Sequence, residues 1–253
     1  MIPEIQKEGK FEYLERGEGT PIILLHGLMG ALSNFESLIA HLSSNGYRVF
    51  IPLLPIFELP LLKTSAKGMA KFLTEFVIHK GLDKFHLLGN SLGGHVALIY
   101  TNKFPENVIT MTLTGSSGLY ESAMGDTFPR REDKNYIREK TQAVFYDPAV
   151  ATDELVDEVY DMVNSREKVV RILAIAKSAI RHNMSKDLPS MNVPTCLIWG
   201  KNDGVTPPDV ANEFHKLLPN SELNWIDECG HAAMMEQPKE FNKIVGDWLK
   251  RHS

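Results

Sequence analysis

The sequence predicts an α/β protein in which a mostly parallel β-sheet is flanked by helices on both faces. Short apolar runs alternate with longer helical patterns near both ends of the chain, which is typical of a parallel sheet. Residues 118–187, in contrast, show helical periodicity and no convincing strand. We therefore expect residues 1–117 and 188–253 to form an α/β core, with residues 118–187 inserted into it as a helical cap.

The strands expected in the first half are compact apolar runs, and each helix between them carries one apolar face. Gly46 and Gly81 end the first two helices, because glycine readily adopts the left-handed conformation that follows many helices. In chain order the elements are a strand at 22–25, a helix at 34–44, a strand at 47–52, a helix at 64–80, a strand at 85–88, a helix at 91–104 and a strand at 108–113.

The second half begins with helical patterns and then returns to the α/β alternation. Apolar residues recur at helical spacing through 153–165 and 167–181, which predicts two helices in the cap. The remaining elements, in chain order, are a strand at 195–199, a helix at 208–218, a strand at 222–226 and a helix at 238–250.

The composition of the 253 residues is that of an ordinary globular protein, with 43% hydrophobic and 23% charged residues. The net charge of -5 is spread along the chain without a basic stripe, which argues against nucleic acid as a partner. No apolar stretch approaches the roughly 18 residues that a membrane-spanning helix needs. Only Cys196 and Cys229 are present, so we expect a reducing, cytoplasmic setting. A monomer or a homodimer is expected.

The strongest local motif is Gly89-Asn90-Ser91-Leu92-Gly93, which lies between a predicted strand and a predicted helix. In this G-x-S-x-G context the serine occupies a sharp turn that exposes its hydroxyl above the sheet. Small residues on either side let the strand and helix approach. Ser91 is therefore the predicted nucleophile, although a serine here could also simply cap the helix.

A serine nucleophile needs a base, and the base needs a carboxylate that orients it. His231 follows the last predicted strand in a loop, where α/β sheets commonly place chemistry. Asp203 follows the strand at 195–199 in a sequence that also suits an ordinary turn. Asp227 is a rival acid, but the order Ser91, Asp203, His231 places each residue after a separate strand.

Acyl transfer also requires donors for the negatively charged oxygen of the tetrahedral intermediate. The backbone N–H of Leu92, directly after the serine, is one expected donor. The loop His26-Gly27-Leu28-Met29-Gly30 follows an earlier strand, and its glycines let the backbone turn inward. We expect the Leu28 N–H to be the second donor. No metal is expected, because His26 and His231 lack the further ligands of a catalytic zinc, and no organic cofactor is implied.

Four motifs in this order resemble the α/β-hydrolase fold family. They are His26-Gly27-Leu28-Met29-Gly30, Gly89-Asn90-Ser91-Leu92-Gly93-Gly94, Gly200-Lys201-Asn202-Asp203 and Gly230-His231. The resemblance covers nearly the whole chain, and it implies a serine hydrolase without metal or cofactor. It also implies the Ser91–His231–Asp203 catalytic triad and a helical cap.

Two branches of that family are similar to this chain. The glycines around Asn90-Ser91 and the Cys229-Gly230-His231 run resemble the carbon–carbon bond hydrolases of aromatic ring-fission products, in which a cap arginine, here Arg171 or Arg181, takes part. The loop around Leu28 equally resembles small esterases. We expect a carboxylic ester hydrolase acting through an acyl-enzyme, with carbon–carbon bond hydrolysis and a non-catalytic receptor as alternatives.

The expected substrate is a small molecule with an apolar acyl or aromatic part. Residues 52–62 are apolar and contain three prolines that keep the loop extended. This loop either packs against the cap or lines the substrate pocket. In the second case the residues expected to contact substrate are Met29, Asn90, Phe57 and Met234, with Met235 beside them.

Overall fold

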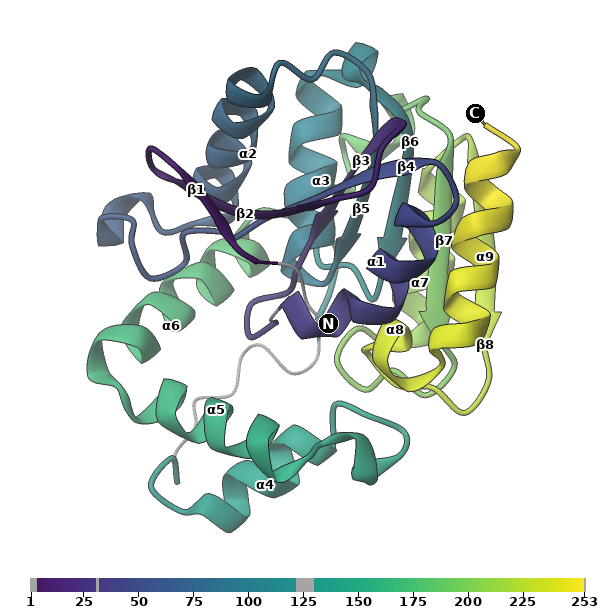
Figure 1. Cartoon of the computed structure of the whole chain (residues 1–253). Coiled ribbons are helices and arrows are strands. Elements are labelled where there is room, and N and C mark those ends of the chain that lie inside the picture. The colour runs from purple at the N-terminus through teal and green to yellow at the C-terminus, as the bar shows by residue number, and fades with distance from the viewer. Residues whose placement is uncertain (1–3, 31, 122–129, 253) are drawn as a thin grey trace.

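The computed structural model describes residues 4–30, 32–121 and 130–252 and is built around one eight-stranded sheet (Figure 1). The strand order across the sheet is β1-β2-β4-β3-β5-β6-β7-β8. The strands are β1 (Gln6–Glu8), β2 (Phe11–Arg16), β3 (Thr20–Leu25), β4 (Tyr47–Pro52), β5 (Phe85–Asn90), β6 (Val108–Thr114), β7 (Thr195–Gly200) and β8 (Ser221–Ile226).

Strands β3 to β8 pair in parallel, and only β1 and β2 are antiparallel to their neighbours. The predicted mostly parallel sheet is therefore confirmed, and each predicted strand is present. The central register aligns Leu25 with Gly89, so the loop after β3 and the turn after β5 begin at the same level of the sheet.

Helices cover both faces of the sheet, and each face has its own apolar core. One face is packed by α2 (Ala66–Lys80), α3 (Leu92–Lys103) and α7 (Pro208–Leu217). The other is packed by α1 (Glu36–Ser43) and α9 (Pro238–Lys250), with the one-turn helix α8 (Ala233–Glu236) beside α1 and α9. Side chains of β3 alternate between the two cores, as a strand buried on both faces requires.

A specific cap determines each end of α2. Gly81 adopts a left-handed conformation, with φ of 63°, and ends α2 at the predicted residue. The helix begins two residues later than predicted because the Ser65 side chain accepts a hydrogen bond from the Gly68 N–H and so caps it.

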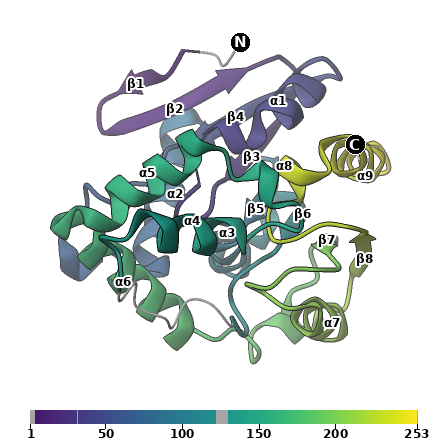
Figure 2. The ribbon, with the colours of Figure 1, turned by 90° about the horizontal axis from the view of Figure 1, so that it is seen from below.

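Three further helices, α4 (Lys134–Gln142), α5 (Asp153–Asn164) and α6 (Arg166–Arg181), come between β6 and β7 in the chain. The last two match the predicted helices, whereas α4 was not predicted. The three helices lie together at one end of the sheet (Figure 1), and the view from below shows α4 and α5 crossing in front of the strands (Figure 2). Ile137 of α4 packs there against Val159 and Val163 of α5.

Candidate active site

Ser91 lies in a sharp turn between β5 and α3. Its φ of 53° and ψ of -119° are unusual for a residue with a side chain. The turn is held by a 3.1 Å hydrogen bond from the Ser91 N–H to the Thr114 carbonyl and a second of 3.1 Å from the Ser117 N–H to the Ser91 carbonyl. These bonds tie the turn to the end of β6 and to the residues after it.

The glycines of the motif allow the turn to pack this closely. A Cβ atom at Gly93 would lie 2.2 Å from the Leu25 carbonyl oxygen, and one at Gly89 would lie 2.4 Å from the backbone of Gly93. Both distances are far below van der Waals contact. The spacing of small residues predicted from the motif therefore has a direct steric cause in the crossing of β3, β5 and α3.

Asp203 and His231 are joined by a buried hydrogen bond. The Nδ1–H of His231 donates to Asp203 Oδ2 at 2.9 Å, and the two residues are 8% and 3% exposed. Asp203 also accepts from the Thr206 hydroxyl at 2.8 Å and from the N–H groups of Val205 and Thr206 at 2.8 and 2.9 Å. The carboxylate is thus fully hydrogen-bonded although it is buried.

The charge around His231 favours its protonated form. Burial of the imidazole is the largest single influence and lowers its pKa. The charge and hydrogen bond of the Asp203 carboxylate, together with the charges of Glu121 and Glu236, act in the opposite direction, and the net pKa of His231 is raised above its ordinary value. Burial in turn raises the pKa of Glu121.

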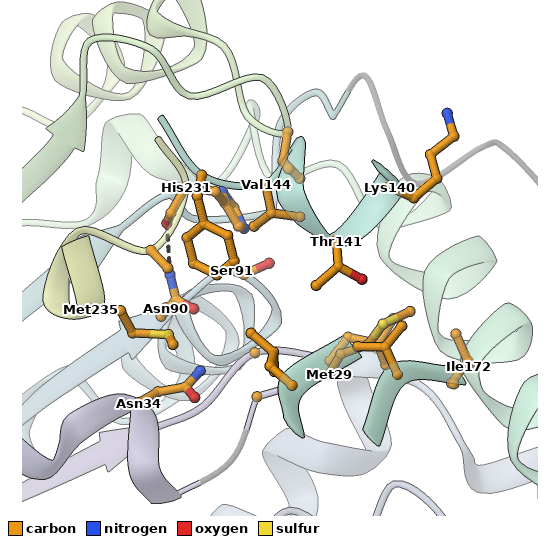
Figure 3. A pocket seen from close by; sticks show the side chains of 18 of the residues that line it. Met29, Asn34, Asn90, Ser91, Lys140, Thr141, Val144, Ile172, His231 and Met235 are labelled. Atoms are coloured by element: carbon orange, nitrogen blue, oxygen red, sulfur yellow. Dashed lines mark hydrogen bonds between the residues drawn. The ribbon is translucent and has the colours of Figure 1, made fainter. Parts of the chain in front are cut away.

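Ser91 and His231 line one cavity of about 280 Å³ between the sheet and α4–α6 (Figure 3). Its walls are mostly apolar, and α4, α5 and α6 each contribute to them. No hydrogen bond joins Ser91 to the His231 ring within the described part of the chain. Such contacts are often loose without substrate. Asp203 lies behind His231 and does not line the cavity.

Leu28 lies in the loop after β3 and lines the same cavity. His26 fixes this loop: one ring nitrogen is 2.8 Å from the Gly27 carbonyl, and the other accepts the Leu54 N–H at 3.2 Å. Burial lowers the pKa of His26, which keeps the ring neutral and suited to one donor and one acceptor role. Leu92 is the first residue of α3, where backbone N–H groups have no partner within the helix.

The predicted substrate-binding residues divide into two pairs. Met29 and Asn90 line the cavity, together with Met235, whereas Phe57 and Met234 are not among the described residues that do so. Met234 is 3% exposed and packs in the core on the α1 and α9 face. Phe57 packs against the opposite core, and the Lys168 ammonium of α6 lies 5.6 Å from its ring centroid.

The cavity also contains residues that sequence reasoning did not identify. Five of them come from α4 and the segment after it, which the sequence pattern did not predict: Tyr136, Lys140, Thr141, Val144 and Phe145. Gly115 is a further such residue near the site, because a Cβ there would lie 2.8 Å from His231 Nδ1. Thr206 was missed as well; its position three residues after Asp203, as in a capping turn, was the available signal.

Neither Arg171 nor Arg181, the candidate arginines of the expected cap, lines the cavity among the described residues. Arg171 pairs with Glu167 at 3.3 Å, and Arg181 is exposed. Lys140 is the one lysine or arginine in the described lining, and Figure 3 shows its ammonium directed away from Ser91.

A family model described as alpha/beta hydrolase fold matches residues 20–173 and 171–238, which is most of the chain. The chain belongs to the alpha/beta hydrolase fold family. The family assignment agrees with the sheet topology and with the turn that carries Ser91.

Relatives of this alpha/beta hydrolase include a solved structure and curated enzymes. The structure of MGS-MChE2, an alpha/beta hydrolase enzyme from a sediment metagenome of the Mar Chica lagoon, Morocco, is 52% identical, with a TM-score of 0.82 and 98% of each chain covered. A 2-hydroxy-6-oxononadienedioate/2-hydroxy-6-oxononatrienedioate hydrolase of Pseudomonas sp is 26% identical over 99% of this chain and 95% of its own. Monoacylglycerol lipase ABHD6 of Mus musculus is 28% identical over 92% of this chain and 76% of its own.

Among its described residues, this alpha/beta hydrolase has neither a membrane-spanning helix nor a cluster of metal-ligating side chains. None of its helices combines the length and apolar character needed to cross a membrane. Within residues 4–30, 32–121 and 130–252, no three histidine, cysteine, aspartate or glutamate side chains gather in a way that could hold a metal ion.

Proposed function

We propose that this protein is a serine hydrolase that cleaves carboxylic esters with an apolar acyl or aromatic part. The observation that carries the proposal is the buried 2.9 Å hydrogen bond from His231 to Asp203, with His231 and Ser91 lining one cavity. This spatial arrangement of acid, base and nucleophile matches the catalytic triad of serine hydrolases.

The reaction follows from the hydrogen bonds. Because the His231 Nδ1–H donates to Asp203, Nε2 carries the free lone pair and acts as the base. It takes the proton from Ser91 as the serine oxygen attacks the ester carbonyl. The N–H groups of Leu28 and Leu92 stabilise the negatively charged oxygen, and His231 then protonates the leaving alcohol. Water, activated by His231, hydrolyses the acyl-enzyme.

The cavity supports a neutral, apolar substrate. Apolar side chains from α5 and α6 form the part farther from the sheet: Leu155, Val159, Ile172, Leu173 and Ala176. A wall of this kind favours an acyl chain or an aromatic ring through burial of apolar surface. We infer that the insertion at 118–187, of which residues 122–129 lie outside the described chain, acts as the cap over this cavity.

Carbon–carbon bond hydrolysis is the second candidate, and the Pseudomonas relative favours it. Its named substrates are dianionic acids, which a site binds best with a positioned cation. Apart from His231 itself, the described lining of the cavity has Lys140 as its one basic residue, and its ammonium is directed away from Ser91. Comparing kcat/KM for such a dienoate with that for short p-nitrophenyl esters discriminates the two reactions: faster turnover of the dienoate would reverse our order of preference.

A fluorophosphonate probe tests the shared mechanism and the receptor alternative. The folded protein should gain one covalent phosphonyl mass, located on Ser91 by peptide mass spectrometry. Ser91→Ala should gain none and lose ester hydrolysis, whereas Ser185→Ala, at an exposed residue, should label normally. An unlabelled wild-type protein that still binds an apolar ester without cleaving it would support the receptor instead.

A further inference from the structure

Glu236 connects the loop that carries His231 to the segment after α4. Glu236 Oε1 accepts the Gly230 N–H at 2.8 Å, and Oε2 accepts the Tyr146 N–H at 2.7 Å. Gly230 directly precedes His231, and Tyr146 lies four residues after the end of α4. One carboxylate therefore links Tyr146 and Gly230, which lie more than eighty residues apart in the chain.

Other contacts draw the same two segments together. The His231 N–H donates to the Val144 carbonyl at 2.9 Å. A Cβ atom at Gly230 would lie 2.6 Å from that same carbonyl oxygen, so the segments pack without space for a side chain. On the opposite side, the Asn90 amide donates to the His231 carbonyl at 3.4 Å, as the dashed line in Figure 3 marks.

We propose that Glu236 is a positioning residue, which holds the His231 loop and residues 144–146 as one unit and so fixes the imidazole relative to Ser91. The proposal rests on the proposed function, because it assumes that His231 is the catalytic base whose position Glu236 fixes. Glu236 does not line the cavity among the described residues. It acts on the backbone that carries the base and not on the substrate.

A carboxylate suits this role better than an amide. Each of its oxygens accepts a backbone N–H, and Oε1 also lies 4.0 Å from the Cys229 thiol. Charge-assisted bonds of this kind are stronger than neutral ones. A glutamine in its place would present one acceptor oxygen and one NH₂ group, which would face one of the two N–H donors directly. The carboxylate is also one of the three acidic groups that raise the pKa of His231, with Asp203 and Glu121.

The experiment compares Glu236→Gln with Glu240→Gln, which removes the same charge from an exposed residue four positions further along the chain, in α9. We expect Glu236→Gln to lower kcat for a p-nitrophenyl ester by roughly 10- to 100-fold, because small displacements of catalytic groups have effects of this size. KM should change little. The acid limb of the kcat/KM profile should move to lower pH, since His231 loses a neighbouring negative charge.

Glu236→Asp separates position from charge. It keeps the negative charge, so the acid limb should stay near that of the wild type, but its shorter side chain cannot reach both N–H groups and kcat should still fall. Circular dichroism and thermal unfolding of each variant establish the folded fraction at the assay temperature. A loss of kcat that only follows the unfolded fraction, or a Glu236→Gln profile matching that of Glu240→Gln, would overturn the proposal.

The proposed function has a separate readout. Fluorophosphonate labelling of wild-type Ser91, with ester hydrolysis lost in Ser91→Ala, tests the hydrolase itself. If the wild type labels and hydrolyses while Glu236→Gln is unchanged, only the positioning role fails. If the wild type does neither, the hydrolase proposal fails, and the role of Glu236 fails with it.

Discussion

His231 Nδ1 lies 2.9 Å from Asp203 Oδ2, with the carboxylate held by three further hydrogen bonds from Val205 and Thr206. Because all four donors converge on one buried side chain, the acid cannot turn away from the imidazole without leaving polar groups unpaired. The orientation of the imidazole is thus determined by a turn at the end of β7.

Asp203→Asn should lower kcat/KM by roughly 10³- to 10⁴-fold, because an amide in this place favours the wrong tautomer of the histidine. Ester hydrolysis by purified variants measures the effect. Asp227→Asn is the matched control: Asp227 is exposed and pairs with Lys201 on the surface. An equal loss in Asp227→Asn would show that the acid has been misassigned.

The pH dependence follows from the raised pKa of His231. The base works only when it is unprotonated, so kcat/KM should fall as the pH falls through this pKa. Since the pKa is raised above its ordinary value of about 6.5, the half-maximal point should lie above pH 6.5. A pH profile of kcat/KM with a neutral ester checks this. A half-maximal point below pH 6 would contradict it.

Gly93→Ala should destabilise the fold by about 1–3 kcal/mol or more, because the new methyl group meets the backbone of β3. The Cβ would lie 2.2 Å from the Leu25 carbonyl oxygen, which cannot move without disturbing the central sheet. Urea unfolding gives the change in the free energy of unfolding. Gly204→Ala, with a nearest contact of 3.9 Å, serves as the control and should change it little.

Leu173→Ala should shift substrate preference toward longer acyl chains, because Leu173 forms part of the wall that α6 contributes. The ratio of kcat/KM for a long to a short p-nitrophenyl ester should rise by roughly 10-fold, the scale of a few methylene contacts in an apolar pocket. Ile180→Ala, on the same helix but 48% exposed and outside the described lining, should leave the ratio unchanged. An equal shift in both variants would mean that a loosened α6, and not the loss of the Leu173 side chain from the cavity wall, changes the substrate preference.

The sequence predicted every parallel strand, because each carries an apolar pattern, although β8 at the edge of the sheet is only partly buried. It missed β1 and β2. All three residues of β1 are exposed, so it has no apolar pattern. In β2 charged residues interrupt the pattern, and Glu15 is accommodated only by Arg48 and Lys80 from distant elements. Such long-range pairing is not visible in the local sequence.

Helix α4 was missed for a related reason. Only Ile137 and Thr141 are buried on it, and Ile137 packs against apolar partners on α5.

The expected substrate pocket also depended on tertiary contacts that the local sequence does not show. Met234 and Met235 are neighbours on α8, and a helix turns by roughly 100° per residue, so one enters the core and the other the cavity. Sequence position alone does not distinguish the two.

The residues around the cavity come from the segments after β3, β5, β7 and β8 and from α4, α5 and α6, which lie between β6 and β7 in the chain. Most of the pairings that bring these segments together are parallel and therefore join distant parts of the chain. Chains with many such distant contacts fold slowly. During refolding, ester hydrolysis should therefore return only in the last kinetic phase, after the helical circular dichroism signal has recovered.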